Sequence, residues 1–298
     1  MAVPDCRYEA SMRKEPTMRA GKQPVLKLAG RVIWLLLVVA VMGTCPNRPG
    51  AALAASAPAA PRVVHVVVAL CDNLNQGIVP VPLAIGNGQN PATNLYWGAA
   101  YGIKTFFSRQ PEWVLVGRQP TPSPQVLERL VFELKGRNLY LVADAWDGKE
   151  IKASIATFLE YAAGDREETI PLDPAAGRPS ELRAGGRAGL VVYVGHNGLM
   201  DFSLDSFPQS AGTGGRDAAV FACLSREYFL EALQQAGARP LILTRSLMCP
   251  EAYSTHALIM GWAGGEAPAA LRERIAAAYS RYQKCSLKAA RSVFAAGE

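Results

Sequence analysis

A near-continuous run of apolar and β-branched residues, RVVHVVVAL at positions 62–70, most constrains how this chain can fold. A strand with one solvated face alternates apolar and polar residues, whereas a strand buried on both faces reads as an unbroken apolar run. Strands of the second kind belong to parallel sheets that helices cover on both faces. The sequence therefore predicts an α/β core with this segment inside the sheet.

Further along the chain, strand-like and helix-like segments alternate. Strands are predicted at 112–116, 138–143, 188–194, 217–222 and 240–244, and helices at 95–107, 151–163, 225–236 (capped by Ser225), 250–262 and from 268 onward. Such alternation indicates an open sheet with right-handed crossovers. We expect a single three-layer α/β domain at 62–298, with helices flanking an open, mostly parallel sheet.

The first 54 residues have the layout of an export signal. A basic stretch precedes an apolar run at 32–45, and Ala52-Leu53-Ala54 matches the small-residue cleavage pattern. The run is shorter than the roughly 20 residues that a transmembrane helix needs. We expect a signal peptide over 1–54, a linker over 55–61 and export to the periplasm or cell envelope. The alternatives are an uncleaved signal anchor, which would be the chain's one membrane contact, and a lipoprotein joined at Cys45.

Charge and cysteine content narrow the function classes. The first 54 residues hold eight of the 31 basic residues and three of the 25 acidic ones, so the remainder is nearly neutral and gives no case for nucleic-acid binding. The body holds Cys71, Cys223, Cys249 and Cys285, which an oxidising compartment would allow to form disulfides. Neither a zinc-ligand spacing nor a Gly-rich phosphate loop is present, so we expect no metal and no cofactor.

The candidate site residues follow the predicted strands, because ligands of open α/β sheets bind beyond the carboxyl ends of the strands. His196 and Cys223 follow two successive strands, which is the minimum for a thiol nucleophile and its general acid–base. Cys223 precedes a helix N-terminus, which predicts a lowered thiol pKa. The amides of Gly198 and Cys223 are candidate oxyanion donors. The other residues expected to line the site are Asp72, Asn73, Asp144, Ser225 and Arg245.

Several nearby features have less specific interpretations. His65 lies in the middle of a strand and is expected to be a hydrogen-bonded core histidine, and His256 is expected to be structural. The Asn/Gln-rich stretch 73–94 is too long for an ordinary connection. It is interpreted either as a loop that binds a polar ligand such as a peptide or glycan, or as a cover for the sheet.

Two sequence blocks resemble those of caspase-like cysteine peptidases, the group that includes caspases, metacaspases, legumains and gingipains. The first block leads into Gly195-His196-Asn197-Gly198, and the second leads into Phe221-Ala222-Cys223. The resemblance covers roughly residues 62–262 as an order of elements. It implies that His196 is the catalytic histidine and Cys223 the nucleophile. It also implies hydrolysis of peptide bonds in a peptide or protein substrate through a thioester acyl-enzyme.

Two departures from that pattern support a second interpretation. Asn197 interrupts the family's His-Gly pair, and His196 and Cys223 are 27 positions apart, a short separation for the family. The alternative is a catalytically inactive caspase-like binding protein of the cell envelope, with the 73–94 loop as its working surface. A hydrolase that uses Asp72 or Asp144 is a third option, for which the sequence offers no motif.

Overall fold

The computed structural model describes residues 60–297 except 175–176, 211 and 213–214, and the chain is α/β as predicted. The predicted signal segment at 1–54 lies outside the described residues, as does most of the linker at 55–61. The elements are β1 (Arg62–Ala69), α1 (Ile103–Arg109), β2 (Trp113–Gln119), β3 (Val126–Leu134), β4 (Leu139–Trp146), the single-turn η2 (Gly148–Glu150), α2 (Ile151–Ala163), β5 (Glu167–Pro171), β6 (Glu181–Gly185), β7 (Leu190–Val194), η4 (Gly198–Met200), β8 (Asp217–Phe221), α3 (Ser225–Gln235), β9 (Arg239–Thr244), α4 (Ala252–Ala263), α5 (Pro268–Gln283), α6 (Leu287–Val293) and β10 (Phe294–Ala296).

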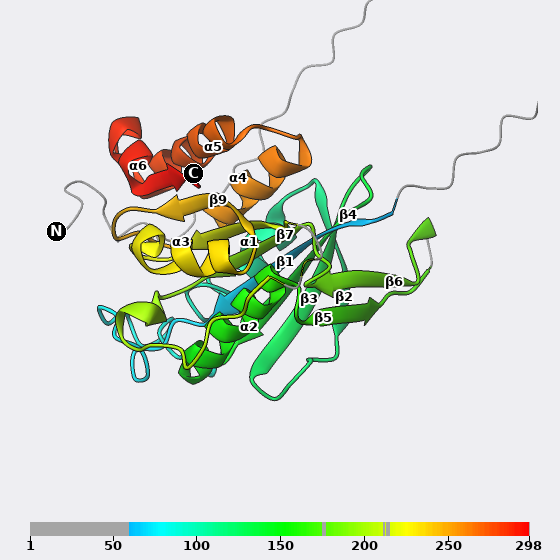
Figure 1. Cartoon of the computed structure of the whole chain (residues 1–298), viewed down its shortest axis with the longest axis horizontal. Coiled ribbons are helices and arrows are strands. Elements are labelled where there is room, and N and C mark those ends of the chain that lie inside the picture. Colours follow the sequence, from blue (N-terminus) through cyan, green and yellow to red (C-terminus); the bar gives the residue numbers. More distant parts are fainter. Residues whose placement is uncertain (1–59, 175–176, 211, 213–214, 298) are drawn as a thin grey trace, which may run out of the picture. The chain divides into compact units, whose positions relative to one another are not determined.

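Eight strands form one mixed sheet in the order β10-β9-β8-β7-β1-β4-β3-β2 (Figure 1). The strands from β9 to β4 in this order are mutually parallel. By contrast, β10, β3 and β2 pair antiparallel at the two sides. The apolar β1 lies between β7 and β4 inside the sheet, where its sequence predicts it. A separate hairpin consists of β5 and β6.

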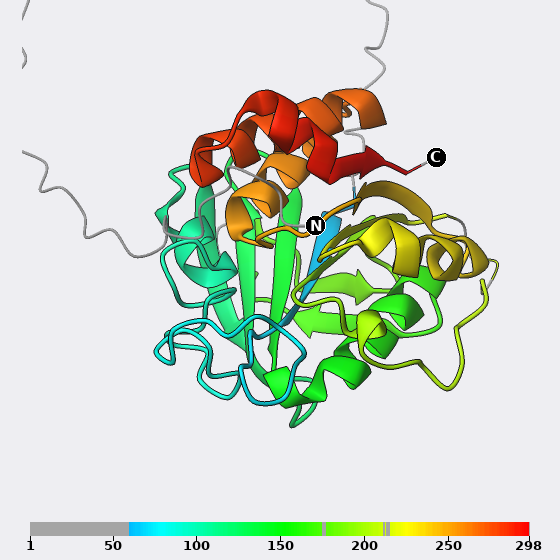
Figure 2. The ribbon, with the colours of Figure 1, turned by 90° about the vertical axis from the view of Figure 1, so that its left-hand side faces the viewer.

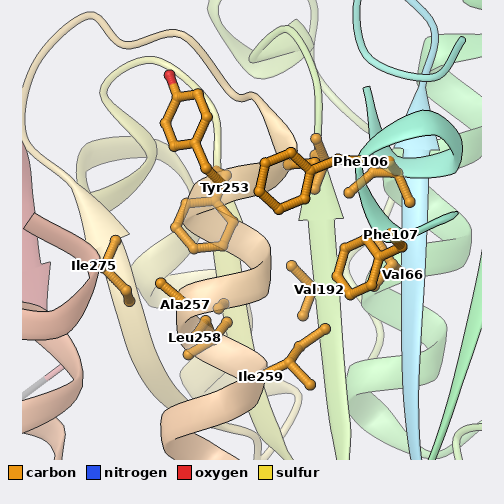
Figure 3. Packing of buried hydrophobic residues seen from close by; sticks show 14 of the residues in the cluster. Val66, Phe106, Phe107, Val192, Tyr253, Ala257, Leu258, Ile259 and Ile275 are labelled. Atoms are coloured by element: carbon orange, nitrogen blue, oxygen red, sulfur yellow. The ribbon is translucent and has the colours of Figure 1, made fainter. Parts of the chain in front are cut away.

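Helices cover both faces of the sheet, and a hydrophobic core lies on each face. Successive residues of β1 belong alternately to these two cores. Val63 and Val67 belong to the core under α2 and α3, whereas Val66 belongs to the core under α1, α4 and α5. Figure 3 shows the second core, where Phe107 of α1 and Leu258 of α4 are among the residues packed with Val66. Both faces of β1 are therefore buried, which is why its sequence is apolar at consecutive positions.

The strands that the sequence analysis did not predict are β3, the β5–β6 hairpin and β10. The predicted helix at 95–107 is also wrong in part, since helix α1 begins only at Ile103. The Asn94 carbonyl accepts the amides of Trp97, Gly98 and Ala99, and this turn takes the place of the first helical turns. The predicted C-terminal helix is interrupted at Lys284, whose φ of +57° ends α5 before α6 begins.

The strand order reverses between β1 and β7. The chain leaves β1 toward β4 on one side of it, then returns to place β7, β8 and β9 on the other side. Loops that leave two such neighbours diverge and open a crevice at their carboxyl ends. Figure 2 shows that end of the sheet, with the cyan segment after β1 beside the yellow-green segment after β7. The fold thus brings the stretches after residues 69 and 194 to one edge.

Within the described ranges, we find no helix of the length and apolarity needed to cross a bilayer.

Candidate active site at the carboxyl edge of the sheet

His196 lies just beyond β7, at the reversal of strand order. Gly195 allows this turn, because its φ of +153° is one that residues with a side chain rarely adopt. A Cβ at Gly195 would also lie 2.9 Å from the Ala69 carbonyl oxygen at the end of β1. The Tyr193 hydroxyl donates to the His196 carbonyl over 2.8 Å. The backbone therefore fixes His196 tightly against the end of β1, and its side chain is buried.

Asp201 holds the imidazole of His196. Its Oδ2 lies 2.6 Å from Nε2 of the ring, and the same oxygen accepts the Gly77 amide over 3.2 Å. Because an ionised carboxylate only accepts hydrogen bonds, we assign the ring proton to Nε2, which leaves Nδ1 facing away from this contact. The sequence analysis missed Asp201. The one signal for it was that Asp201 is the acidic residue nearest to His196 along the chain.

Cys223 lies two residues beyond β8, and its sulfur contacts the Met248 backbone. The Met248 amide donates to Sγ over 3.4 Å, and the Met248 carbonyl oxygen lies 3.6 Å from Sγ. Burial raises the pKa of the Cys223 thiol, and the Met248 amide offsets this only in part. The predicted lowering of this pKa is therefore wrong. The first amide of α3, that of Ser225, donates to Thr244 Oγ1 rather than to the sulfur.

The backbones that carry the two candidate catalytic residues lie side by side. Strands β7 and β8 are parallel neighbours, and the Gly195 amide donates to the Phe221 carbonyl over 3.2 Å. Two residues further on, Asn197 Nδ2 donates to the Cys223 carbonyl over 2.7 Å. The structure thus brings His196 and Cys223 to one rim. In the described residues no hydrogen bond joins their side chains, since the ring is bonded to Asp201 and the sulfur to Met248.

The turn between Cys223 and α3 is strained. Leu224 has a φ of +51° and a ψ of 29°, the left-handed region that costs a residue with a Cβ roughly 1–2 kcal/mol. Its amide donates to the Ser246 carbonyl over 3.1 Å, in the segment that also reaches the Cys223 sulfur. Observed strain of this kind gathers at ligand clamps and active sites. The strained residue Leu224 therefore lies directly beside the candidate nucleophile Cys223.

The backbone amides of Gly198 and Cys223, the two candidate oxyanion donors, differ in whether they are already hydrogen-bonded. The Gly198 amide donates to the His196 carbonyl over 3.1 Å inside the tight turn that begins η4, so it is not free. The amide of Cys223 makes no hydrogen bond with any described residue. The prediction of Gly198 as a donor is corrected on this ground, and the Cys223 amide is the better candidate.

Asp72 and Asn73 hold the loop that follows β1. The amides of Leu74 and Asn75 and the side chains of Asn75 and Gln89 donate to the Asp72 carboxylate. Burial opposes the charge of Asp72, but these hydrogen bonds outweigh it and lower the pKa of the carboxyl. The Asn73 side chain bonds both the amide and the carbonyl of Val81. Both residues lie at the predicted edge, and their side chains serve to order the loop.

Asp144 is not at that edge, contrary to its prediction as a residue lining the site. Strand β4 continues to Trp146, so Asp144 lies inside the strand and is buried. Both of its oxygens bind Arg129 over 2.6 Å, and Oδ2 also lies 2.9 Å from His65 Nε2. Burial would raise the pKa of Asp144, but the hydrogen bonds from Arg129 and His65 hold it at about 2. Asp144 is the centre of a buried structural ion pair.

His65 is a hydrogen-bonded core histidine, as predicted. The Gly185 amide donates to its Nδ1 over 2.9 Å, which places the ring proton on Nε2, toward Asp144. Tyr161 stacks on the ring with 4.7 Å between centroids. His256 is also hydrogen-bonded, with 2.8 Å between its Nε2 and Oε1 of Glu112. Among the described residues, neither histidine forms a hydrogen bond with Cys223.

Ser225 and Arg245, the remaining predicted site residues, do not form part of a site with His196. The Ser225 hydroxyl is buried and bonds the Val220 carbonyl and the Thr244 amide and hydroxyl. It joins β8, β9 and α3, and it is the first residue of that helix rather than its cap. Arg245 is exposed just after β9, where its amide donates to the Val293 carbonyl. The structure places Ser225 in the core, and among the described residues no hydrogen bond joins Arg245 to His196 or Cys223.

The four cysteines of the body, Cys71, Cys223, Cys249 and Cys285, are free thiols in the structure. Burial raises the pKa of Cys71 to about 12, because its hydrogen bond with Tyr96 offsets only part of the lost hydration. Across the part of the chain that the structure describes, no group of three histidine, cysteine or carboxylate side chains is arranged to hold a metal ion.

Comparison of the chain with protein-family models, with curated proteins and with solved structures finds no match. The geometry of the rim therefore carries the functional argument. It combines a thiol, an imidazole and a carboxylate that holds the imidazole, at the edge of the sheet where open α/β folds generally bind ligands.

Proposed function

We propose that the chain is a cysteine peptidase of the caspase-like type, with Cys223 as nucleophile and His196 as general acid–base. The observation that carries the proposal is the delivery of both residues to the ends of adjacent parallel strands, β7 and β8, at the reversal of strand order. Asp201 adds the group that orients the base, which is the third element of the nucleophile–base–orienter arrangement.

The reaction has two halves. The Cys223 sulfur attacks the carbonyl carbon of a peptide bond, while His196 takes the thiol proton and returns it to the departing amine. A thioester to Cys223 remains. Water, deprotonated by His196, then attacks the thioester, and the proton returns to the sulfur as the acid leaves. The Cys223 amide is placed to donate to the carbonyl oxygen as it gains charge.

A second candidate function is a catalytically inactive binding protein with the same fold. Two observations favour it: burial raises the pKa of the Cys223 thiol, and the sulfur is engaged by Met248 instead of His196. In this alternative the loop after β1 is the working surface and the thiol is a buried structural group. The two candidates differ in whether Cys223 reacts with an electrophile that resembles a peptide.

A labelling experiment separates them. The full chain is incubated with a peptide acyloxymethyl ketone, and the modified residue is located by mass spectrometry. The peptidase proposal requires labelling at Cys223 and a loss of at least tenfold in its rate in His196→Ala. His256→Ala, a histidine bonded to Glu112 elsewhere, is the matched control and keeps the rate. Labelling that is absent, or independent of His196, supports the inactive binding protein.

The proposal includes export to the periplasm or cell envelope, on the basis of the basic stretch and apolar run that precede residue 54. Expression in a bacterial host followed by fractionation tests this. The expected result is a periplasmic product whose N-terminus, read by mass spectrometry, begins close to Ala55. A full-length cytoplasmic product argues against export.

A further inference from the structure

We infer that Asn197 is a positioning residue, which fixes the backbone of Cys223 against the turn that carries His196. The inference rests on the proposed function, because it says how the two candidate catalytic residues are held in place. Asn197 directly follows His196 in the chain, and 0% of its surface is exposed. It is also the residue that interrupts the His-Gly pair of the family that the sequence resembles, so its contacts require a side chain that glycine lacks.

Both ends of the Asn197 side chain are hydrogen-bonded. Nδ2 donates to the Cys223 carbonyl over 2.7 Å, and Oδ1 accepts the Leu199 amide over 3.2 Å. These partners fix the orientation of the side-chain amide, because a carbonyl only accepts and a backbone N–H only donates. The first bond joins the segment after β7 to the segment after β8, and the second caps the short turn η4.

The turn that Asn197 caps also carries Asp201, which holds the ring of His196. The Asp201 amide donates to the Gly198 carbonyl over 2.9 Å, and Asp201 Oδ2 lies 2.6 Å from His196 Nε2. The imidazole and the carboxylate that orients it therefore belong to one short turn. Asn197 is the member of this turn that reaches across to the backbone of Cys223.

The peptide unit between Cys223 and Leu224 is held on both sides. Its carbonyl accepts the hydrogen bond from Asn197, and its N–H, that of Leu224, donates to the Ser246 carbonyl over 3.1 Å. The C=O and N–H groups of a trans peptide point in opposite directions, so two such bonds fix the plane of the peptide. Asn197 supplies the one of these two bonds that comes from the side of the candidate base.

A fixed peptide plane determines where the Cys223 sulfur can move. The sulfur contacts the Met248 backbone in the structure, so it must turn toward His196 before the ring can take its proton. With the backbone held, that movement is a rotation about the Cα–Cβ bond between staggered positions. Displacing a reacting group by about 1 Å can lower a rate by about a hundredfold. Loss of the Asn197 donor should therefore slow the reaction of the sulfur.

The test measures labelling of Cys223 by the peptide acyloxymethyl ketone in the full chain and in two variants. Asn197→Asp keeps an acceptor for the Leu199 amide and removes the donor, whereas Asn197→Ala removes both without adding a buried charge. In each variant the maximal labelling rate should fall at least tenfold. The half-saturating ketone concentration should change less than threefold, because the buried residue 197 does not contact the peptide. Alkylation of Cys223 by iodoacetamide at pH 9, which needs no bound peptide, should not fall.

Ser280→Ala is the matched control. It removes a side-chain hydroxyl that donates to the carbonyl of another cysteine, Cys285, also over 2.7 Å. Its labelling and alkylation rates should equal those of the parent, and thermal unfolding checks that each variant is folded at the assay temperature. If neither variant folds, the parent chain still decides the matter by ¹⁵N NMR. The Nδ2 protons of Asn197 should exchange slowly with water, and exchange as fast as that of exposed side-chain amides overturns the inference.

Three further results overturn the inference: unchanged labelling in both variants, a matching fall in iodoacetamide alkylation, or a matching fall in Ser280→Ala. These outcomes are distinct from failure of the peptidase proposal. A parent chain that the ketone never labels at Cys223 refutes the peptidase proposal and this inference with it. A parent that is labelled, with both Asn197 variants labelled equally fast, refutes the positioning role alone.

Discussion

Asp201 and His196 are joined by a 2.6 Å hydrogen bond between Oδ2 and Nε2, and this bond sets both the tautomer and the orientation of the ring. Asp201 is part of the short turn that follows η4, and its other contact is with the amide of Gly77. A carboxylate so placed stabilises the imidazolium that forms when His196 accepts the thiol proton. The bond therefore links the loop after β1 to the chemistry proposed for Cys223.

If Asp201 orients His196, Asp201→Asn should lower kcat for hydrolysis of a peptide substrate at least tenfold, with a smaller effect on KM. Asp205→Asn, which removes an exposed carboxylate bonded only to Lys152 among the described residues, is the control. Equal kinetics in the two variants would show that Asp201 has no part in catalysis.

The buried thiol of Cys223 should react slowly with small electrophiles. Its pKa is raised above the ordinary 9.0, so the thiolate fraction at pH 7 is below that of a free cysteine. Alkylation by iodoacetamide, followed by peptide mapping, should be slower than that of free cysteine at pH 7 and should accelerate as the pH passes 9. A rate at pH 7 equal to or above that of free cysteine would contradict the burial argument.

Glu251 should make stability fall as pH rises. Burial raises the pKa of Glu251 to about 7 from the ordinary 4.5, and hydrogen bonds from Tyr253 and Gln283 offset only part of this. The folded state therefore holds a proton that the unfolded chain releases near pH 4.5. Stability is lost between about pH 4.5 and 7, by up to roughly 3 kcal/mol, and then levels off.

Glu251→Gln isolates that effect, because the amide stays neutral at every pH. The difference in unfolding free energy between the variant and the parent, measured by urea titration, should grow in favour of Gln from pH 5 to pH 8. A constant difference over that range would show that the carboxyl at position 251 does not titrate as its burial implies.

The buried pair of Asp144 and Arg129 should be costly to break. Asp144→Ala leaves the Arg129 guanidinium in the core with only Glu168, at 3.3 Å, as an ionic partner among the described residues. We expect a loss of about 3–5 kcal/mol in unfolding free energy. Arg183→Met, which breaks an exposed pair with Glu167, should cost less than about 1 kcal/mol. Losses of similar size in both variants would refute the distinction.

At position 224, glycine should give a more stable protein than alanine, which is the reverse of the usual order. In ordinary strands and helices glycine is less stable than alanine, but at a φ of +51° the Cβ is the source of strain. Leu224→Gly should therefore be more stable than Leu224→Ala by about 1 kcal/mol, as read from urea unfolding. If alanine proves the more stable, the turn after Cys223 is not strained.

The parallel strands could be predicted because each of them has a recognisable apolar run within its own sequence. The runs that became β1, β7 and β9 are apolar at consecutive positions, and burial on both faces is the direct cause of that pattern. Strand β3 escaped prediction because its partly exposed positions interrupt the apolar run. The three residues of β10 are too few for any pattern.

The site was predictable only at the level of strand ends. His196 and Cys223 follow recognisable strands, so their shared rim follows from the topology. Asp144 was misplaced because pairing with β3 extends β4 beyond its apolar stretch. Asp201 was missed because it reaches His196 through the folding of a turn, and the roles of the amides in the 73–94 loop depend on contacts that the sequence does not show.

The buried Asp144 also fixes the alignment of the strands around it. Arg129 of β3 is the register partner of Asp144, and His65 of β1 is next to it on the other side. Sliding β4 by one residue would turn the carboxylate toward the opposite face, among Leu130 and Leu141, with no cation to meet it. A purely apolar strand could pair with its neighbours in more than one register. The buried charge of Asp144 makes the shifted registers of β4 unfavourable and so favours the single observed pairing with β3 and β1.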